Sequence, residues 1–97
     1  MIQFVIEALD HTDEEGLSRR MAVREKHLAG ATALKSNGNY IIGGAKIDDD
    51  GKMIGSMMVL QFPTEEDFKA YFAEEPYVKG NVWGKIDVFK FRVAAVK

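Results

Sequence analysis

The sequence predicts an α+β protein built on an antiparallel sheet, and three observations support this. Segments rich in β-branched and aromatic residues alternate with helical segments in the order strand, helix, strand, strand, helix, strand. Cap and breaker residues bound each helical segment. A polar turn joins the two middle strands into a hairpin. This order is the split βαβ pattern of a ferredoxin-like sandwich, in which both helices lie on one face of the sheet.

The length and composition set the scale of the molecule. The chain has 97 residues, of which 46% are hydrophobic and 29% charged, as in ordinary globular proteins. We therefore expect one domain, residues 1–97, without room for a second core. Two helices cover one face of the predicted sheet. A homodimer that packs sheet against sheet is the economical way to cover the other face.

Charge and residue usage exclude several classes of function. A net charge of −2 and a pI near 5.6 argue against a nucleic-acid partner. The absence of cysteine excludes disulfides, thiolate metal sites and a cysteine nucleophile. The N-terminal segment lacks a basic region and a long apolar run, so we expect neither a signal peptide nor a membrane span. We expect a cytoplasmic protein.

The first strand and the first helix have recognisable ends. Residues 2–9 are rich in β-branched and aromatic side chains and predict a strand. Thr12 or Asp13 is the expected cap of the helix that follows, because both side chains accept hydrogen bonds from free helical N–H groups. The helix is predicted to run to about Ser36. Gly38 then suits the left-handed conformation that often ends a helix.

The first helix is predicted to be amphipathic. Five apolar residues recur at the spacing of one helix face, namely Leu17, Met21, Leu28, Ala31 and Leu34. Arg20, Arg24 and His27 form a neighbouring stripe, because residues three or four apart lie above one another. This stripe is either a solvated basic edge or the rim of a pocket.

The middle of the chain predicts a hairpin. Residues 40–47 form its first strand, in which Gly43 and Gly44 indicate a bulge or a close backbone approach. Residues 48–52 are a polar turn, and residues 53–62 form the second strand. The three aspartates of the turn lack the longer ligand pattern of a calcium loop, so we interpret them as a solvated loop.

The second helix and the last strand complete the pattern. Thr64 is the candidate cap of the helix, and acidic residues fill its first turn. The helix is expected to end near Ala73, because Pro76 disfavours helical geometry in the preceding residue. Residues 74–80 then form a tight connector. The last strand lies within residues 82–96.

The histidines are the first candidates for chemistry. His27 can exchange a proton near neutral pH, although a histidine at a helix edge also commonly makes one structural hydrogen bond. His11 lies in a polar turn and is expected to be exposed. A metal site with two histidines needs a carboxylate and convergent geometry, and the sequence indicates neither.

The turn after the second helix supplies a second candidate. Glu75 precedes Pro76 and Tyr77, and in the predicted fold this turn lies beyond one end of the sheet. A carboxylate there can face the first helix, orient His27 and raise its basicity. The alternative is a solvated acid that ends a helix. Tyr77 either donates a hydrogen bond to a ligand or fills the core.

Taken together, these residues resemble a known family, the YciI-like (YCII-related) proteins, over nearly the whole chain. The resemblance rests on Arg20, Arg24, His27-Leu28, Gly38, Ile41-Ile42, Gly44, Glu75-Pro76-Tyr77 and Asn81. It implies a ferredoxin-like dimeric α/β barrel with a pocket in each protomer. It also implies an active site on the histidine of the first helix and the acid before Pro-Tyr. One branch of the family is associated with dehydrochlorination of chlorinated hydroxyhydroquinones, a lyase activity. Family members usually carry Asp before Pro-Tyr, whereas this chain has Glu75.

We therefore interpret the protein as a small-molecule enzyme that acts on a small anionic or phenolic compound. In this hypothesis His27 is the general acid/base and Glu75 orients it. The guanidiniums of Arg20 and Arg24 bind an anionic oxygen of the substrate. The hydroxyl side chains of Tyr77 and Ser56 line the pocket. The reaction class is elimination or isomerisation, and no metal or organic cofactor is required.

Two other functions remain open at this stage. One is a non-catalytic binding or regulatory homodimer with the same pocket. The other is a structural dimer in which the stripe of Arg20, Arg24 and His27 makes salt bridges between subunits.

Overall fold

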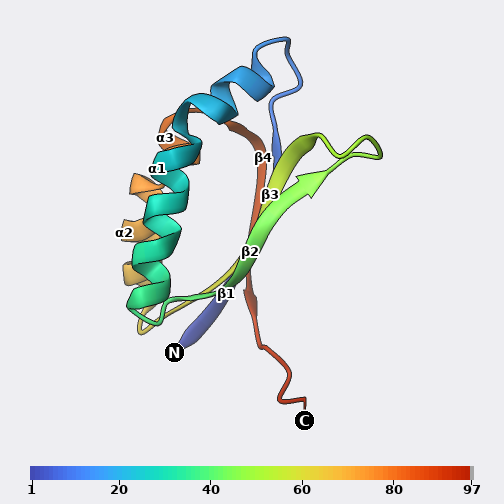
Figure 1. The fold of residues 1–97 in the computed structure, drawn as a ribbon. Helices are drawn as coiled ribbons and strands as arrows, with labels where there is room; N and C mark the ends of the chain where they lie inside the picture. The colour runs from blue at the N-terminus through green and yellow to red at the C-terminus, as the bar shows by residue number, and fades with distance from the viewer. Residues whose placement is uncertain (97) are drawn as a thin grey trace.

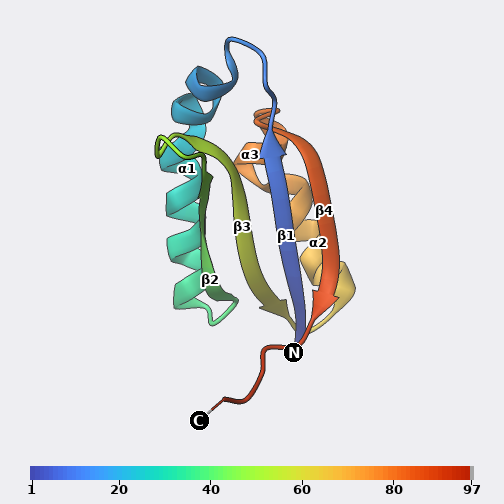
Figure 2. The ribbon, with the colours of Figure 1, turned by 90° about the vertical axis from the view of Figure 1, so that its right-hand side faces the viewer.

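The computed structural model describes residues 1–96, and its elements follow the predicted order (Figure 1). They are β1 (Ile2–Asp10), α1 (Gly16–Ser36), β2 (Tyr40–Ile47), β3 (Met53–Phe62), α2 (Glu65–Glu74), α3 (Pro76–Lys79) and β4 (Trp83–Phe91). The four strands form one antiparallel sheet in the order β2-β3-β1-β4. All the helices lie on the same face of this sheet (Figures 1 and 2). The predicted ferredoxin-like α+β sandwich is confirmed.

Two of the predicted helix ends are confirmed and one is wrong. The side chain of Thr64 caps α2 by accepting from the backbone N–H of Asp67 at 3.1 Å. Gly38 follows α1 with a φ of 79°. The N-cap of α1, however, is Glu15, which makes no side-chain capping bond. The helix begins at Gly16, so Thr12 and Asp13 lie before the cap position, and the carboxylate of Asp13 accepts from the guanidinium of Arg19 instead.

The segment predicted as a connector, residues 74–80, contains the short helix α3. Glu75 is its N-cap and accepts from the backbone N–H of Tyr77 at 2.7 Å. Pro76 occupies the first helical position, where its missing N–H costs no hydrogen bond. The same proline that ends α2 therefore starts α3, and the carboxylate between the two helices is held toward the interior.

The core lies between the helices and the inner face of the sheet. Alternate residues of β1 and β3 point inward, where they meet side chains from α2, α3 and the start of β4. The buried set is Phe4, Ile6, Ala8, Met58, Leu60, Phe62, Phe68, Tyr77, Val82 and Trp83. Phe4 and Phe68 stack with ring centroids 4.3 Å apart, which fixes α2 on the sheet. No helix within residues 1–96 is long and apolar enough to cross a membrane.

The predicted orientation of α1 is wrong. Leu17, Met21 and Leu28, expected in the core, are 38%, 51% and 44% exposed. Arg20 and His27 instead point inward and are 3% and 9% exposed. Leu34 and Ala31 are half-buried. The polar side chains can occupy the interior because partners from other elements satisfy their hydrogen bonds, which periodicity does not reveal.

The outer face of the sheet has no covering layer within residues 1–96 (Figures 1 and 2). Large apolar side chains stand on it from all four strands and are exposed, namely Leu9, Ile42, Met57, Phe89 and Phe91. An ion pair between Lys46 and Glu7 at 3.3 Å lies on the same face.

Gly55 allows β3 to approach β1 closely. A Cβ at this position would collide with the backbone carbonyl oxygen of Ala8, whereas a Cβ at Gly44 would meet nothing within 4 Å. The close approach positions the next residue, Ser56, which points inward and is buried.

We expect Gly55→Ala to lower the free energy of unfolding by about 1–3 kcal/mol, because the added methyl forces two strand backbones apart. Gly44→Ala is the matched control and should change it by less than about 0.5 kcal/mol. Urea unfolding followed by circular dichroism measures both. Equal effects of the two substitutions would contradict this account.

Candidate functional site

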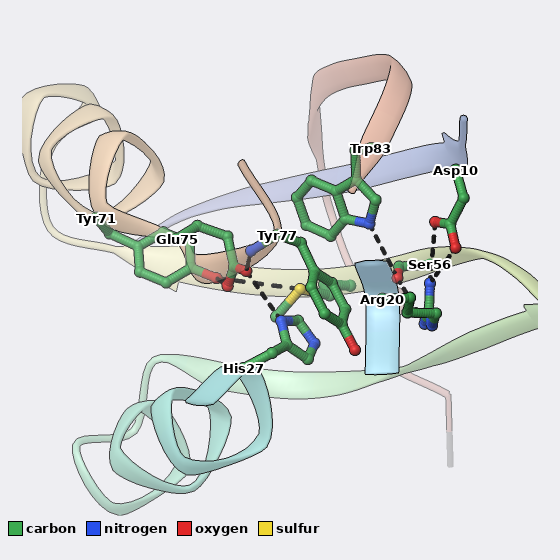
Figure 3. A network of polar contacts seen from close by, with 9 residues as sticks. Asp10, Arg20, His27, Ser56, Tyr71, Glu75, Tyr77 and Trp83 are labelled. Atoms are coloured by element: carbon green, nitrogen blue, oxygen red, sulfur yellow. Dashed lines mark hydrogen bonds and ion pairs between the residues drawn. The ribbon is translucent and has the colours of Figure 1, made fainter. Parts of the chain in front are cut away.

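The imidazole of His27, on α1, and the carboxylate of Glu75, at the end of α2, point toward each other (Figure 3). Nδ1 of His27 lies 2.9 Å from Oε1 of Glu75, which accepts also from the backbone N–H of Tyr77. The second oxygen, Oε2, accepts from the hydroxyl of Tyr71 at 3.1 Å. Because the carboxylate is an acceptor for Nδ1–H, this contact favours the tautomer in which Nε2 carries no proton.

The longer side chain of Glu75 does not separate the acid from the histidine. Glu75 is 3% exposed, and it caps α3 while it reaches His27. The contact between these two residues that the sequence predicts is present. The catalytic role of the contact stays a prediction.

The ring of Tyr77 lies between His27 and Arg20 (Figure 3). It stacks on the imidazole at 3.9 Å between centroids and an interplanar angle of 10°. The Cζ atom of Arg20 lies 4.8 Å from the centroid of the same ring. Trp83 meets the edge of the imidazole at 6.2 Å. These contacts fix the plane of the His27 ring, while its Nε2 has no hydrogen-bond partner within residues 1–96 and keeps contact with solvent.

Most of the donor groups of Arg20 form hydrogen bonds inside the protein. Its Nη1 donates to both carboxylate oxygens of Asp10, at 3.0 and 3.1 Å, and its Nη2 donates to Oγ of Ser56 at 3.1 Å. Trp83 donates its indole N–H to the same Oγ. The Nε of Arg20 is buried without a partner in the described part of the chain. Arg20 and Ser56 connect α1 to the sheet through these hydrogen bonds. Their predicted contacts with a ligand stay predictions.

Arg24 differs from Arg20, although one helical turn separates them. It is half-buried and forms no ion pair with any residue from 1 to 96. The charge of Arg24 also affects Tyr77. Burial raises the pKa of the Tyr77 hydroxyl, and the positive charges of Arg20 and Arg24 oppose that rise. The site thus presents one imidazole nitrogen and one unpaired cation, whereas Tyr77 is 1% exposed and fills the core behind the imidazole.

Three residues of the site, Asp10, Tyr71 and Trp83, were not among the candidates that the sequence indicated. The spacing of Tyr71 four residues before Glu75 on a helix was a usable signal. The partners of Arg20 carried none, because β1 and β3 meet α1 only in the folded chain.

A cavity of about 190 Å³ opens at the end of β1. It reaches the carboxylate end of the Arg20–Asp10 pair, and its walls include Leu17, Met53 and Ile54. His27 and Glu75 do not line it. A pocket at His27 itself stays a prediction. Within residues 1–96, no group of three or more histidine and acidic side chains is placed to hold a metal ion.

We expect Asp10→Asn to lower the free energy of unfolding by about 3–5 kcal/mol, because it leaves the charge of Arg20 buried without its counter-ion. Asp13→Asn is the control: it breaks the exposed pair with Arg19 and should change stability little. Thermal unfolding by calorimetry checks both. A similar small effect at both positions would mean that the buried pair does not hold α1 in place.

The comparisons with known proteins agree with this architecture. The model of the YCII-related domain matches residues 2–92. An uncharacterised protein of Haemophilus influenzae (strain ATCC 51907 / DSM 11121 / KW20 / Rd) is 32% identical over 82 residues, covering 78% of this chain and 84% of that protein.

Two solved structures show the same fold. One is the 5-chloro-2-hydroxyhydroquinone dehydrochlorinase of Burkholderia phenoliruptrix AC1100 in complex with 2,5-dihydroxybenzoquinone, with a TM-score of 0.81, 21% identity and 95% of each chain covered. The other is a cofactor-independent oxygenase from Streptomyces nogalater, with a TM-score of 0.55, 10% identity and coverage of 98% of this chain and 94% of that one. The family match extends over nearly the whole chain, and this protein therefore belongs to the YCII-related domain family.

Proposed function

We propose that this protein is an enzyme that moves a proton on a small anionic or phenolic compound, with His27 as general acid/base and Glu75 as its orienting partner. One observation carries the proposal. A buried carboxylate lies 2.9 Å from Nδ1 of His27, while Nε2 of the same ring has no protein partner in residues 1–96. This is the arrangement that makes an imidazole nitrogen available as a base.

The chemistry follows from the tautomer. With Nδ1–H donated to Glu75, the lone pair of Nε2 takes a proton from the substrate. The electron pair left behind expels a leaving group in an elimination, or is protonated at another atom in an isomerisation. The imidazolium formed lies against the carboxylate of Glu75, which stabilises its charge. His27 then returns the proton to solvent or to the product.

The substrate oxygen would be bound by the groups beside His27. Arg24 supplies a cation with paired donors and forms no ion pair within residues 1–96. Tyr77 is 1% exposed, and its ring supports the imidazole by stacking on it. Arg20, which is paired with Asp10, and Ser56 form a polar wall behind these groups. An anionic or phenolic oxygen held there would place an adjacent C–H or O–H near Nε2.

The likeness to a dehydrochlorinase supports elimination as the reaction to test first. At 21% identity that likeness shows the fold, so the substrate must be established by experiment. We propose loss of HCl from the keto tautomer of a chlorinated hydroxyhydroquinone, in which the chlorine lies on an sp³ carbon. Nε2 takes a proton from a ring hydroxyl or C–H, the released electron pair forms the new π bond of a hydroxyquinone, and the C–Cl bond breaks as chloride leaves with its electron pair.

The test measures chloride release from 5-chloro-2-hydroxyhydroquinone. We expect His27→Ala to lower kcat by about 10²–10⁴-fold, the usual contribution of a general acid/base. His11→Ala is the matched control, because that histidine contacts Asn81 outside the site and its removal should leave kcat unchanged.

Equal rates in the two variants would contradict the role of His27. If the wild-type protein binds the compound, without turnover of it or of related phenols, the pocket belongs to a binding module. A purely structural role requires that His27→Ala and Arg24→Ala change the oligomeric mass alone.

The outer face of the sheet supports a homodimer as part of the same proposal. Strands lie about 4.8 Å apart and rise about 3.3 Å per residue, so the outer face of the sheet measures roughly 500 Å² as a flat rectangle. Its side chains protrude and make the accessible surface larger than this flat area. A standard interface buries about 800 Å² of accessible surface per partner, so a second copy packed sheet to sheet is of the right size.

We expect sedimentation to give twice the mass of one chain for the wild type and the mass of one chain for Phe89→Lys. Phe89 lies on the outer face and is 46% exposed, so a lysine there leaves the fold intact and places a charge in the interface. Leu28→Lys also replaces an exposed apolar residue by lysine, but on α1 and away from the outer face of the sheet, so this variant should remain dimeric. A wild-type monomer would exclude this interface.

A further inference from the structure

Tyr71 is held in place by its ring, independently of its hydroxyl. It projects from α2 and packs against two phenylalanines, with its ring centroid 5.5 Å from that of Phe62 and 6.3 Å from that of Phe68. Its hydroxyl lies 3.1 Å from Oε2 of Glu75 (Figure 3). The same hydroxyl also lies 4.0 Å from Sδ of Met58, a much weaker acceptor. Removing the hydroxyl therefore leaves the ring where it is and takes away the hydrogen bond to Glu75 together with this weak contact.

The carboxylate of Glu75 depends on that hydrogen bond. Its Oε1 accepts from the backbone N–H of Tyr77 and from His27. Within residues 1–96, its Oε2 accepts from Tyr71 and from no other donor. Glu75 is almost fully buried, so solvent cannot readily replace a lost donor. Burial, reinforced by the charge of Glu75, raises the pKa of the Tyr71 hydroxyl well above its usual range, so it stays a proton donor.

The geometry requires two anchors for this side chain. A glutamate has three rotatable bonds, and the bonds from Tyr77 and His27 both meet the same oxygen, Oε1, so they do not hold the other oxygen in place. The hydroxyl of Tyr71 fixes the other oxygen and thereby the plane of the carboxylate. Only with that plane fixed does the lone pair of Oε1 continue to face Nδ1 of His27.

We propose that Tyr71 is a positioning residue, whose hydroxyl holds Oε2 of Glu75 so that Oε1 selects the Nδ1–H tautomer of His27. Its consequence for turnover rests on the function proposed above. Its consequence for the tautomer does not, because the contact exists in the protein without a substrate.

The presence of glutamate at position 75 makes this role specific. Tyr71 lies one helical turn before Glu75, at the i, i+4 spacing. Aspartate is a common helix cap, and at position 75 it would keep the bond to the N–H of Tyr77. Its side chain, shorter by one methylene, cannot keep that bond and also reach Tyr71 as Glu75 does. Loss of the Tyr71 hydroxyl should therefore change the His27 tautomer when residue 75 is glutamate and leave it unchanged when residue 75 is aspartate.

The experiment records the ¹⁵N resonances of the His27 imidazole at a pH at which the ring is neutral. In the wild type we expect a protonated Nδ1 and an unprotonated Nε2. In Tyr71→Phe we expect both resonances to move toward the averaged values of exchanging tautomers. Tyr40→Phe is the matched control, because the Tyr40 hydroxyl has no hydrogen-bond partner within residues 1–96, and it should leave the spectrum unchanged.

An unchanged His27 spectrum in Tyr71→Phe overturns the proposal, and so does an equal change in Tyr40→Phe. The Glu75→Asp background adds an independent test. There Tyr71→Phe should cause no further change in the His27 resonances, and a change as large as in the Glu75 background contradicts the anchoring account.

Kinetics separate this inference from the proposed function. Tyr71→Phe should lower kcat for chloride release about tenfold while KM stays unchanged, by analogy with the hydrogen-bond partners of metal ligands, whose removal costs about 10–100-fold. If the wild type has no activity but Tyr71→Phe alters the tautomer, the enzyme proposal fails and the positioning role stands. If the wild type is active and Tyr71→Phe has wild-type spectrum and kcat, the positioning role alone fails.

Discussion

The buried carboxylate of Glu75 is the contact on which the rest of the site depends. It caps α3, accepts from His27 on α1 and accepts from Tyr71 on α2. One charged group therefore joins three helices at a point that water barely reaches. In such surroundings each hydrogen bond is strong and each missing one is costly, so the geometry of the site and the packing of the helices are coupled.

A second buried polar cluster attaches α1 to the sheet. Arg20 bridges Asp10 at the end of β1 and Ser56 on β3, and Trp83 donates to Ser56 from the start of β4. Buried ion pairs are expensive to desolvate and often add little stability, but they define one arrangement of their partners. Here they hold Arg20 over one face of Tyr77, and His27 stacks on that ring as well. The two polar clusters thus meet at one aromatic ring.

The sequence predicted the elements well and the orientation of α1 badly. Thr64 and Gly38 were identifiable because capping and left-handed geometry are properties of a few neighbouring residues. The pairing of His27 with Glu75 was also predicted, from the position of the turn in the predicted fold and from the family resemblance. The apolar seam of Leu17, Met21 and Leu28 failed, because periodicity assumes that polar residues face water. The catalytic role of the pair and the homodimer remain predictions.

What the sequence determined by itself is local: the order of strands and helices, most of their ends, and the placement of a histidine on one helix and an acid beside a proline. What the tertiary structure decided is which polar side chains enter the interior. Arg20 is buried because strands far away in the chain bring Asp10 and Ser56 to it, and Oε2 of Glu75 is satisfied because Tyr71 lies one turn before it on a packed helix. A buried polar group is stable only when its partners are in place, and those partners meet only in the folded protein.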